Sequence, residues 1–293
     1  MLTSLVLTLT TDHPLTFPAH LGRAQSGDFG RASHAAFLRL IAGADPALAE
    51  RLHAPDERRP FTCSSLWGAR RRGGDLTPNT PVFLRYTGLT AEVSQHLQRL
   101  AAHPPTHIEI ENVPLAVQQA TLDPAAHPWA GQTTYEALAA QHLLPGAPPA
   151  PHVELEFAAP TAFRSGGLTV PVPLPGLVYG SLVDRWNAFA PVAVSEEVRR
   201  FAEECLAISR YELSTRAVPG KGEALRIGCV GRCRYVAVNR DRYWLGLIQL
   251  LTDYAFYAGV GAQTTMGMGQ ARRSQEAEGR GSKGAEERRS GGT

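Results

Sequence analysis

The segment YAGVGAQTTMGMGQARR, residues 257–273, places glycines and polar side chains directly before two arginines. Its glycines are Gly259, Gly261, Gly267 and Gly269, and the polar side chains between them are Gln263, Thr264 and Thr265. Glycines let a ligand approach backbone N–H groups, and arginine forks bind phosphate oxygens in pairs. The segment could therefore cradle the phosphates of a nucleotide, hold a nucleic-acid backbone, or form a difficult turn.

Two nucleotide-binding patterns do not fit this segment. A dinucleotide fingerprint places its glycines after a strand and at the start of a helix, whereas these glycines follow an apolar helical pattern at 243–259. A P-loop needs a lysine before its final Ser or Thr, and the segment has none. The remaining functional interpretation is a backbone surface that a phosphodiester chain can approach, aided by Arg272 and Arg273. The structural alternative is a helix C-cap followed by a bulged strand.

Basic side chains are almost all arginine, since Lys221 and Lys283 are the only lysines among 29 Lys and Arg residues. Arginine suits planar phosphate recognition, although GC-rich coding favours the same composition. The positions of the charges are more informative, because residues 210–242 hold eight basic residues against three acidic ones. Such a cluster, which includes Arg232 and Arg234, is expected for a polyanionic partner.

Hydrophobic alternation and helical periodicity divide the chain into two similar halves. The first half predicts strands at 2–10, 61–68, 81–89 and 107–117 and helices over 33–53 and 90–102. The second predicts strands at 152–160, 210–218, 225–238 and 266–273 and helices at 174–189, 195–209 and 243–259. Both halves follow the order β-α-(α)-β-β-α-β, so the predicted fold class is α+β with two tandem ferredoxin-like domains.

The predicted domains are residues 1–120 and 151–274, joined by an Ala-, Pro- and His-rich linker at 121–150. Residues 275–293 hold no apolar side chain larger than alanine, which predicts a solvated, disordered tail. The four cysteines lack zinc-site spacing, so we expect no metal and no cofactor. No apolar run could span a bilayer and no signal peptide is recognisable at the N-terminus, which predicts a cytoplasmic protein.

Four segments of the chain resemble one known family. They are GRASHAAFLRLIAGADPALAERLHAPDERRPFTCSSLWG, FAAPTAFRSGG with PLPGLVYGSLVDRWNAF, IGCVGRCRY and GVGAQTTMGMGQ. Together, and in this order, they are similar to the CRISPR-associated endoribonucleases that process precursor CRISPR RNA, members of the RAMP superfamily. The resemblance covers nearly the whole chain except the linker and the tail. It implies two tandem ferredoxin-like domains, as the element order also predicts.

The resemblance implies metal-independent cleavage of CRISPR repeat RNA, leaving 2′,3′-cyclic phosphate and 5′-OH ends. A ribose 2′-OH would attack the adjacent phosphate, which needs a base for the hydroxyl, an acid for the departing oxygen and cations for the phosphate charge. The implied partners are precursor and mature CRISPR RNA, with other subunits of a CRISPR effector complex as further candidates and no membrane. The alternative is a non-catalytic RAMP-type RNA-binding subunit.

His34 lies near the start of the first predicted helix, where the family commonly carries its catalytic histidine. A helix N-terminus disfavours the imidazolium, which would keep His34 neutral and able to accept a proton. His34 also belongs to an i, i+3, i+4, i+7 pattern with Phe37, Leu38 and Ile41. A place at the edge of the core is therefore the structural alternative.

His53 ends the second predicted helix, where a charged imidazole is favoured and could serve as an acid or a phosphate contact. Some family members carry their catalytic histidine here, followed by a basic residue that Arg58 or Arg59 would match, and pair it with a tyrosine where this chain has Leu38. His34 is thus the stronger candidate, and the assignment of base and acid stays open. The residues expected to contact RNA are Arg59, Arg232, Arg234, Gly259, Gly261, Gln263, Thr264, Thr265, Gly267, Gly269, Arg272 and Arg273.

Overall fold

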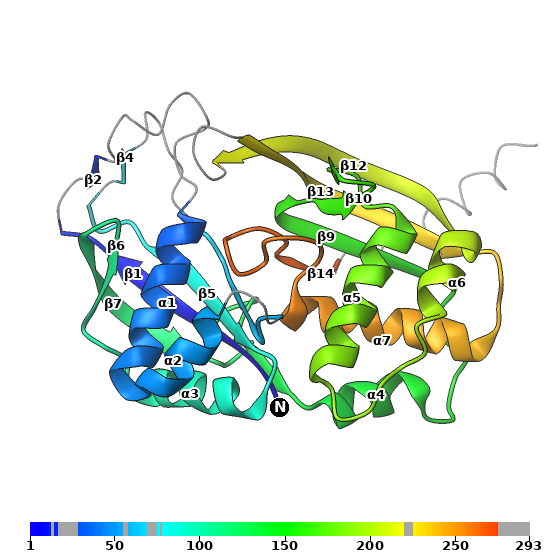
Figure 1. Ribbon diagram of the computed structural model, residues 1–293, viewed down its shortest axis with the longest axis horizontal. Coiled ribbons are helices and arrows are strands. Elements are labelled where there is room, and N and C mark those ends of the chain that lie inside the picture. The colour runs from blue at the N-terminus through cyan, green and yellow to red at the C-terminus, as the bar shows by residue number, and fades with distance from the viewer. Residues whose placement is uncertain are drawn as a thin grey trace, which may run out of the picture.

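The computed structural model describes residues 1–12, 15–16, 29–54, 58–68, 75–76, 78–219 and 225–274. The tail expected at 275–293 lies outside these residues. The two halves of the chain lie side by side, each with helices packed against an antiparallel sheet (Figure 1). This arrangement confirms the α+β class with two tandem ferredoxin-like folds.

The N-terminal half is built on one antiparallel sheet with the strand order β3-β5-β1-β7-β6. Its elements are β1 (Leu2–Thr10), β2 (Leu15–Thr16), α1 (Gly30–Ala44), α2 (Pro46–His53), β3 (Phe61–Cys63), β4 (Asp75–Leu76), β5 (Val82–Gly88), α3 (Ala91–Ala102), β6 (His107–Ile110) and β7 (Val113–Thr121). Helices α1, α2 and α3 bury their apolar side chains against this sheet in one core cluster. Burial of that apolar face is what holds the start of α1 in place.

The helix ends in this half follow their capping residues. The Asp45 side chain accepts from the Leu48 N–H at 2.9 Å, with Pro46 at the first position of α2. Thr90 caps α3 in the same way. The segment 107–117, predicted as one strand, is instead the hairpin β6–β7, which turns at Glu111 and Asn112 with φ of 51° and 63°. The strand predicted over 61–68 is shorter in the structure, where β3 ends at Cys63.

The C-terminal half carries a four-stranded antiparallel sheet with the order β12-β13-β9-β14. Its elements are β9 (His152–Thr161), β10 (Phe163–Ser165), β11 (Leu168–Val170), α5 (Pro175–Phe189), α6 (Val198–Cys205), β12 (Leu206–Pro219), β13 (Leu225–Ala237), α7 (Arg242–Ala258) and β14 (Ala271–Arg273). Side chains of α5, α6 and α7 pack with inward side chains of β9 and β13 in a second core cluster.

Two predicted elements of this half have different bounds. The helix expected over 195–209 ends at Cys205, and Leu206 already belongs to β12, because its alternating residues pair with β13. The closing strand expected over 266–273 begins only at Ala271, since the residues before it form a compact loop. Between the halves, residues 121–150 contain β8 (Gly131–Thr133), which pairs with β1, and α4 (Tyr135–Leu143), which packs near α7.

The two halves meet around Arg85 of β5, a fully buried arginine. Its Nε donates to Ser4 Oγ at 2.8 Å and to the Trp129 carbonyl at 3.1 Å, and its Nη1 donates to Gln270 Oε1 at 2.6 Å. Its Nη2 donates to the carbonyl of Phe256, at the end of α7. Arg85 therefore ties the N-terminal sheet to both ends of the glycine-rich segment.

Candidate active site

The glycine-rich loop, residues 259–270, begins where α7 ends. All four of its glycines have positive φ, at 66°, 76°, 87° and 71°, as does Gln263 at 60°. Side chains at two of them would also collide with the backbone, because a Cβ on Gly261 would lie 2.4 Å from the Ala162 carbonyl oxygen and one on Gly269 2.3 Å from that of Val260. The glycines are thus required by the path of the loop itself.

The loop lies against the N-terminal half. The Cys63 N–H donates to the Thr264 carbonyl and the Gly267 N–H donates to the Cys63 carbonyl, both at 3.1 Å. A Cβ on Gly30, the first residue of α1, would lie only 2.0 Å from the Met266 carbonyl oxygen. The loop therefore extends the edge of β3 and covers the start of α1.

His34 lies directly beneath this loop. Its ring is buried and stacked on Phe61, and its Nδ1 lies 3.1 Å from the carbonyl oxygen of Thr265. A carbonyl only accepts, so Nδ1 carries the proton in this contact and Nε2 is left with a lone pair. Burial first, and then the positive charge of Arg59, lower the pKa of His34 to about 4. The imidazole is therefore neutral at neutral pH.

The cause of this neutrality differs from the expected one. Helix α1 begins at Gly30 rather than at Ser33, so His34 is the fifth residue of the helix and not the second. Burial, and not the helix N-terminus, dominates the lowered pKa.

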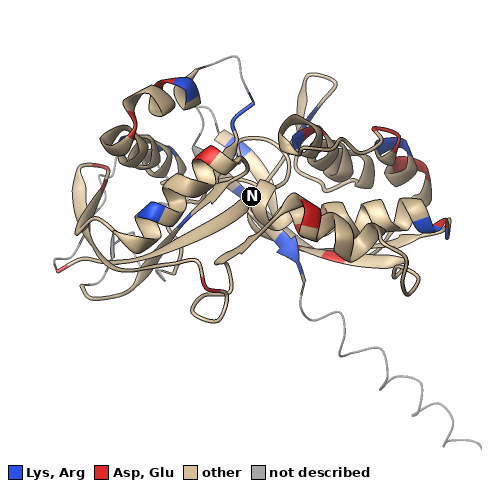
Figure 2. Ribbon diagram, turned by 90° about the horizontal axis from the view of Figure 1, so that it is seen from below, with Lys and Arg blue, Asp and Glu red and all other residues tan. Residues whose placement is uncertain are grey.

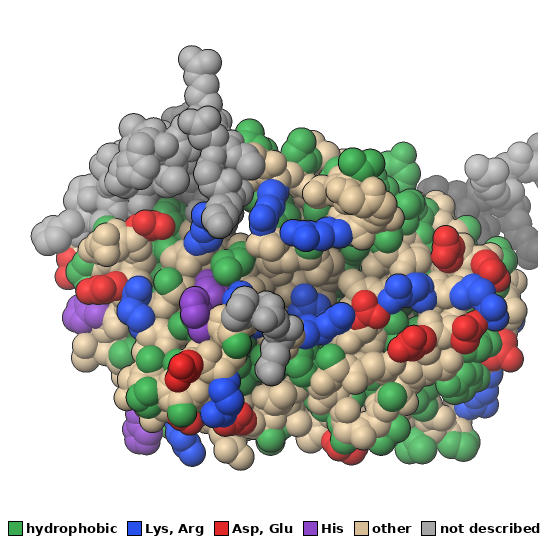
Figure 3. Space-filling view, viewed as in Figure 1, with side chains coloured by type: hydrophobic (Ala, Val, Ile, Leu, Met, Phe, Trp, Pro, Cys, Tyr) green, Lys and Arg blue, Asp and Glu red, His purple; other side chains and the backbone are tan. Residues whose placement is uncertain are grey.

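Three of the sequence-predicted side chains gather in one place. Arg59, and more weakly His53, lie close enough to His34 for their charges to lower its pKa. His53 is exposed at the end of α2 and Arg59 is half-buried before β3. Basic and histidine side chains surround the middle of this face of the molecule, where the two halves meet (Figure 3). Two histidines, a guanidinium and the glycine-rich loop thus share one site.

The polar residues of the loop differ in accessibility. Gln263 and Thr265 are half-buried, whereas Thr264 is buried and its Oγ1 has no hydrogen-bond partner among the described residues. Gly267 and Gly269 are buried, while Gly261 is partly open. The open part of the loop therefore consists of Gly261, Ala262, Gln263, Thr265 and Met266.

The other predicted basic residues lie elsewhere. Cys233 and Tyr235 point into the core beneath α5, so Arg232 and Arg234, which alternate with them on β13, point to the opposite face of the sheet. There the pairing register places them across from Glu156 and Glu154. The structure therefore does not bring these two arginines to His34.

The two arginines after the loop are also paired with acids. The Arg272 Nε donates to Glu156 at 2.8 Å and the Arg273 Nε donates to Asp253 at 2.5 Å. Figure 2 shows acidic segments beside the basic end of β14. These carboxylates neutralise much of the local positive charge.

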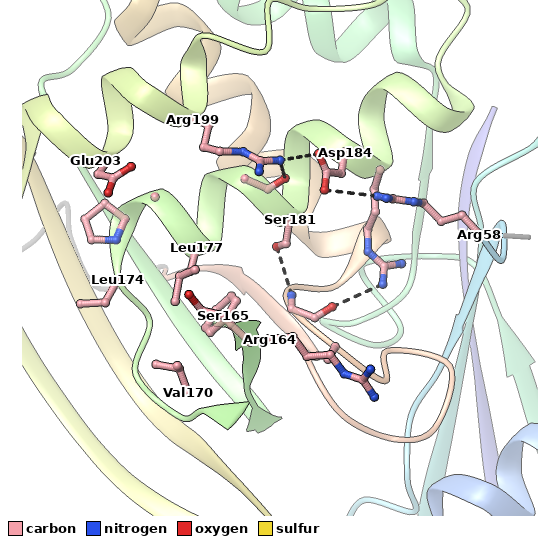
Figure 4. Close-up of a pocket in the computed structure, with 17 residues that line it drawn as sticks. Arg58, Arg164, Ser165, Val170, Leu174, Leu177, Ser181, Asp184, Arg199 and Glu203 are labelled. Atoms are coloured by element: carbon pink, nitrogen blue, oxygen red, sulfur yellow. Dashed lines mark hydrogen bonds and ion pairs between the residues drawn. The ribbon is translucent and has the colours of Figure 1, made fainter. Parts of the chain in front are cut away.

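A cavity of about 740 Å³ lies beside the glycine-rich loop, between α5 and the hairpin β10–β11 (Figure 4). Arg58, Arg164, Arg185 and Arg199 line it, together with Gly261 and Ala262 of the loop. Sequence reasoning did not assign a role to Arg164 or Arg185, although both stand in segments that carry the family resemblance. Only the folded structure, which places both side chains beside the glycine-rich loop, identifies them as candidate ligand-binding residues.

Among the described residues, no group of three or more His, Cys, Asp or Glu side chains is placed to hold a metal ion. Over the same part of the chain, no helix has both the length and the apolar character needed to cross a membrane.

Comparisons with known proteins agree with this architecture. A family model described as CRISPR-associated endoribonuclease Cas6 matches residues 155–271. No curated protein matches the chain. A solved Cas6 product complex is 28% identical with a TM-score of 0.71, covering 93% of this chain and 99% of that chain. A Cas6 substrate mimic complex is 27% identical with a TM-score of 0.69, covering 93% and 99%.

The Cas6 of Thermus thermophilus gives a similar result, with 26% identity, a TM-score of 0.70, and coverage of 94% of this chain and 98% of that chain. These structural matches cover 93% and 94% of the chain and therefore extend over both halves. Residues 155–271 thus match the Cas6 family model, and nearly the whole chain is similar to solved Cas6 structures.

Proposed function

We propose that this protein cleaves CRISPR repeat RNA in precursor transcripts by attack of a ribose 2′-OH on the adjacent phosphate, without a metal ion. The observation that carries the proposal is the neutral, buried His34, whose Nδ1 is engaged by the Thr265 carbonyl while Nε2 keeps its lone pair. A fixed imidazole of this kind can accept the proton of the attacking hydroxyl. The similar Cas6 structures determined with a product and with a substrate mimic support RNA as the substrate.

The reaction can be written with the side chains near the loop. His34 Nε2 takes the 2′-OH proton as the 2′-oxygen bonds to phosphorus, and the bond from phosphorus to the 5′-oxygen breaks. The exposed His53 gives a proton to that departing oxygen, and the Arg59 guanidinium stabilises the extra negative charge on the phosphate. The products are a 2′,3′-cyclic phosphate and a 5′-OH. His34 ends the step with the proton of the 2′-OH, and His53 ends it without the proton that it gave to the 5′-oxygen.

Retention of the product is part of the proposal. The similar Cas6 protein was captured in complex with its product. A site that neutralises phosphate charge makes the same contacts with the cleaved RNA as with the intact RNA. We infer that the cleaved repeat stays bound here and is passed on to other subunits of an effector complex.

The test is cleavage of repeat RNA from the same genome in EDTA, with a second RNA that carries one 2′-deoxy nucleotide at the scissile position. The wild type should cut the first and not the second. His34→Ala should slow cleavage about 10²-fold or more while the Kd for the uncut RNA changes little. His103→Ala, at an exposed histidine that ends α3, is the matched control and should cut at the wild-type rate. Tight binding without any cutting would instead identify a non-catalytic RNA-binding subunit.

A further inference from the structure

The cavity beside the glycine-rich loop has a cationic side. Four arginines line it against two carboxylates, Asp184 and Glu203. Arg199 and Arg58 both face Asp184, at 2.6 Å and 3.7 Å, so this one carboxylate is shared by two guanidiniums. The cavity wall is therefore net positive and suits an anionic group.

Arg164 is the cation most available to a ligand. Its side chain is exposed on β10, and no hydrogen bond or ion pair joins it to any other described residue. Arg185 is held differently, since its Nη2 lies 3.5 Å from the Gly261 carbonyl oxygen while Ser181 Oγ accepts from the Gly261 N–H at 3.1 Å. Figure 4 shows these contacts from α5 to the loop, with the Arg164 guanidinium apart from them.

The opposite side of the cavity is apolar. Phe163, Val170, Leu174 and Leu177 line it, and Leu174 is 45% exposed. A flat, weakly hydrated surface such as a nucleobase would cover these side chains, whereas a bare phosphate or a metal ion would leave them in water. The pairing of an apolar wall with a cationic side on which Arg164 is available to a ligand matches a nucleotide.

The cavity is continuous with the candidate active site. Ala262 lines the cavity and Thr265 holds His34, and three peptide steps separate their Cα atoms by at most about 11 Å. Arg58 lines the cavity while its neighbour Arg59 acts on His34. An RNA strand whose phosphate reaches His34 therefore passes the mouth of this cavity within a few nucleotides.

We propose that this cavity binds one unpaired nucleotide of the RNA substrate, close to the scissile phosphate, with its base on the Leu174 side and its phosphate at Arg164. The inference rests on the proposed function, since it takes RNA to be the substrate. The volume of about 740 Å³ lies within the range of small-ligand sites and is far too small for a double helix. Sequence preference beside the cleavage site would then arise partly here.

The phosphate contact is tested with Arg164→Ala and with Arg99→Ala, an exposed arginine on α3 that removes the same charge far from the cavity lining. The probe is fluorescein-labelled repeat RNA made uncleavable by the 2′-deoxy substitution, titrated by anisotropy over a range of salt concentrations. Loss of one phosphate contact should weaken binding about fivefold at 0.1 M salt and reduce the slope of log K against log salt by about 0.7. Equal behaviour of the two variants would overturn the proposal.

The base contact is tested with a set of RNAs that each lack one base at an unpaired position near the cut. One abasic position should weaken binding to the wild type, and Leu174→Ser should remove that difference. Leu174 is the N-cap of α5 and makes no side-chain capping bond, so serine there keeps the helix folded. If no abasic position changes the affinity for RNA, the nucleotide proposal is wrong. It is also wrong if AMP or UMP binds in the cavity without reducing the affinity for RNA. Normal cleavage by the wild type in either case keeps the proposed function intact.

Discussion

The Nδ1 atom of His34 lies 3.1 Å from the carbonyl oxygen of Thr265, which is 231 residues later in the chain. This contact joins the first helix of one half to the glycine-rich loop of the other. It orients the imidazole through a backbone group, so the orientation depends on the path of the loop and not on the identity of the Thr265 side chain. The catalytic geometry that we propose therefore exists only when both halves are folded together.

The lowered pKa of His34 makes a prediction about stability. The pKa is about 4 in the folded protein and about 6.5 in an unfolded chain, so the unfolded state binds more protons between these values. The free energy of unfolding should fall as the pH falls from 6.5 towards 4, with a loss from this group on the order of 2 kcal/mol at pH 5.

His34→Gln lacks the titrating group, so its stability should fall less over the same range. Urea denaturation of both proteins at pH 7 and pH 5 measures the difference. Parallel losses in the two proteins would show that His34 is not buried as a neutral imidazole. The cleavage rate of the wild type should correspondingly fall near pH 4 and not near pH 6.5.

The close approach of α1 to the loop predicts contrasting effects of two glycine substitutions in one helix. Gly30→Ala would force a Cβ to 2.0 Å from the Met266 carbonyl oxygen, so either the helix or the loop must move. We expect a loss of stability of at least about 2 kcal/mol and slower RNA cleavage.

Gly43→Ala is the matched control, because nothing lies within 4 Å of a Cβ at that position of α1. Alanine there should raise the free energy of unfolding by about 0.5–1 kcal/mol and leave cleavage unchanged. Chemical denaturation and single-turnover cleavage of both variants provide the comparison. Equal stabilities would mean that α1 and the loop can separate without cost.

Much of the local structure could be predicted from short-range signals. Asp45 and Pro46 start α2, Thr90 starts α3, and the strands with clear alternation lie close to their predicted positions. The hairpin β6–β7 was missed because its turn residues, Glu111 and Asn112, include neither glycine nor proline.

The site depends on relationships that no local pattern contains. The excess of arginine over residues 210–242 predicted a phosphate-binding surface. A count of charges along that segment does not include the acidic side chains of the strand that pairs with it. Strand β9 places Glu154 and Glu156 across from Arg234 and Arg232. Conversely, Arg164 and Arg185 are unremarkable in the sequence and become notable only because the fold places them beside Gly261.

Substitution of Thr264, whose hydroxyl is buried, can distinguish a structural role of this side chain from a contact with RNA. Its side chain is 1% exposed, its Oγ1 has no partner among the described residues, and its Cγ2 would contact a Cβ at Gly259 or Gly269. Thr264→Val keeps the packing methyl and removes an unsatisfied hydroxyl, so stability should rise by about 0.5–1 kcal/mol. The Kd for RNA should not change, and a large loss of affinity would show that the hydroxyl turns outwards to the ligand. Thr264→Ser, which loses the methyl, should be destabilising by about 1 kcal/mol.

Arg85 predicts how the two halves unfold. Among the described residues no carboxylate pairs with it, yet four acceptors from separate segments and the rings of Trp129 and Phe256, 5.0 Å and 4.6 Å from its Cζ, surround the guanidinium. Burial lowers its pKa to about 9, so it is still a cation at neutral pH. Methionine at this position would fill part of the space but leave Gln270 Oε1 and the Phe256 carbonyl without the arginine donor.

Arg85→Met should therefore lower the free energy of unfolding by about 3 kcal/mol or more, and Arg85→Lys should restore only part of it because one ammonium cannot reach all the acceptors. Because the acceptors belong to both halves, the wild type should unfold in a single transition and Arg85→Met in two. Calorimetry of the variants measures both effects, with Arg99→Met as a surface control expected to stay within about 0.5 kcal/mol of the wild type. If Arg85→Met unfolds in one transition at the wild-type temperature, the halves are held together by other contacts. In that case the loop that orients His34 does not depend on this buried cation.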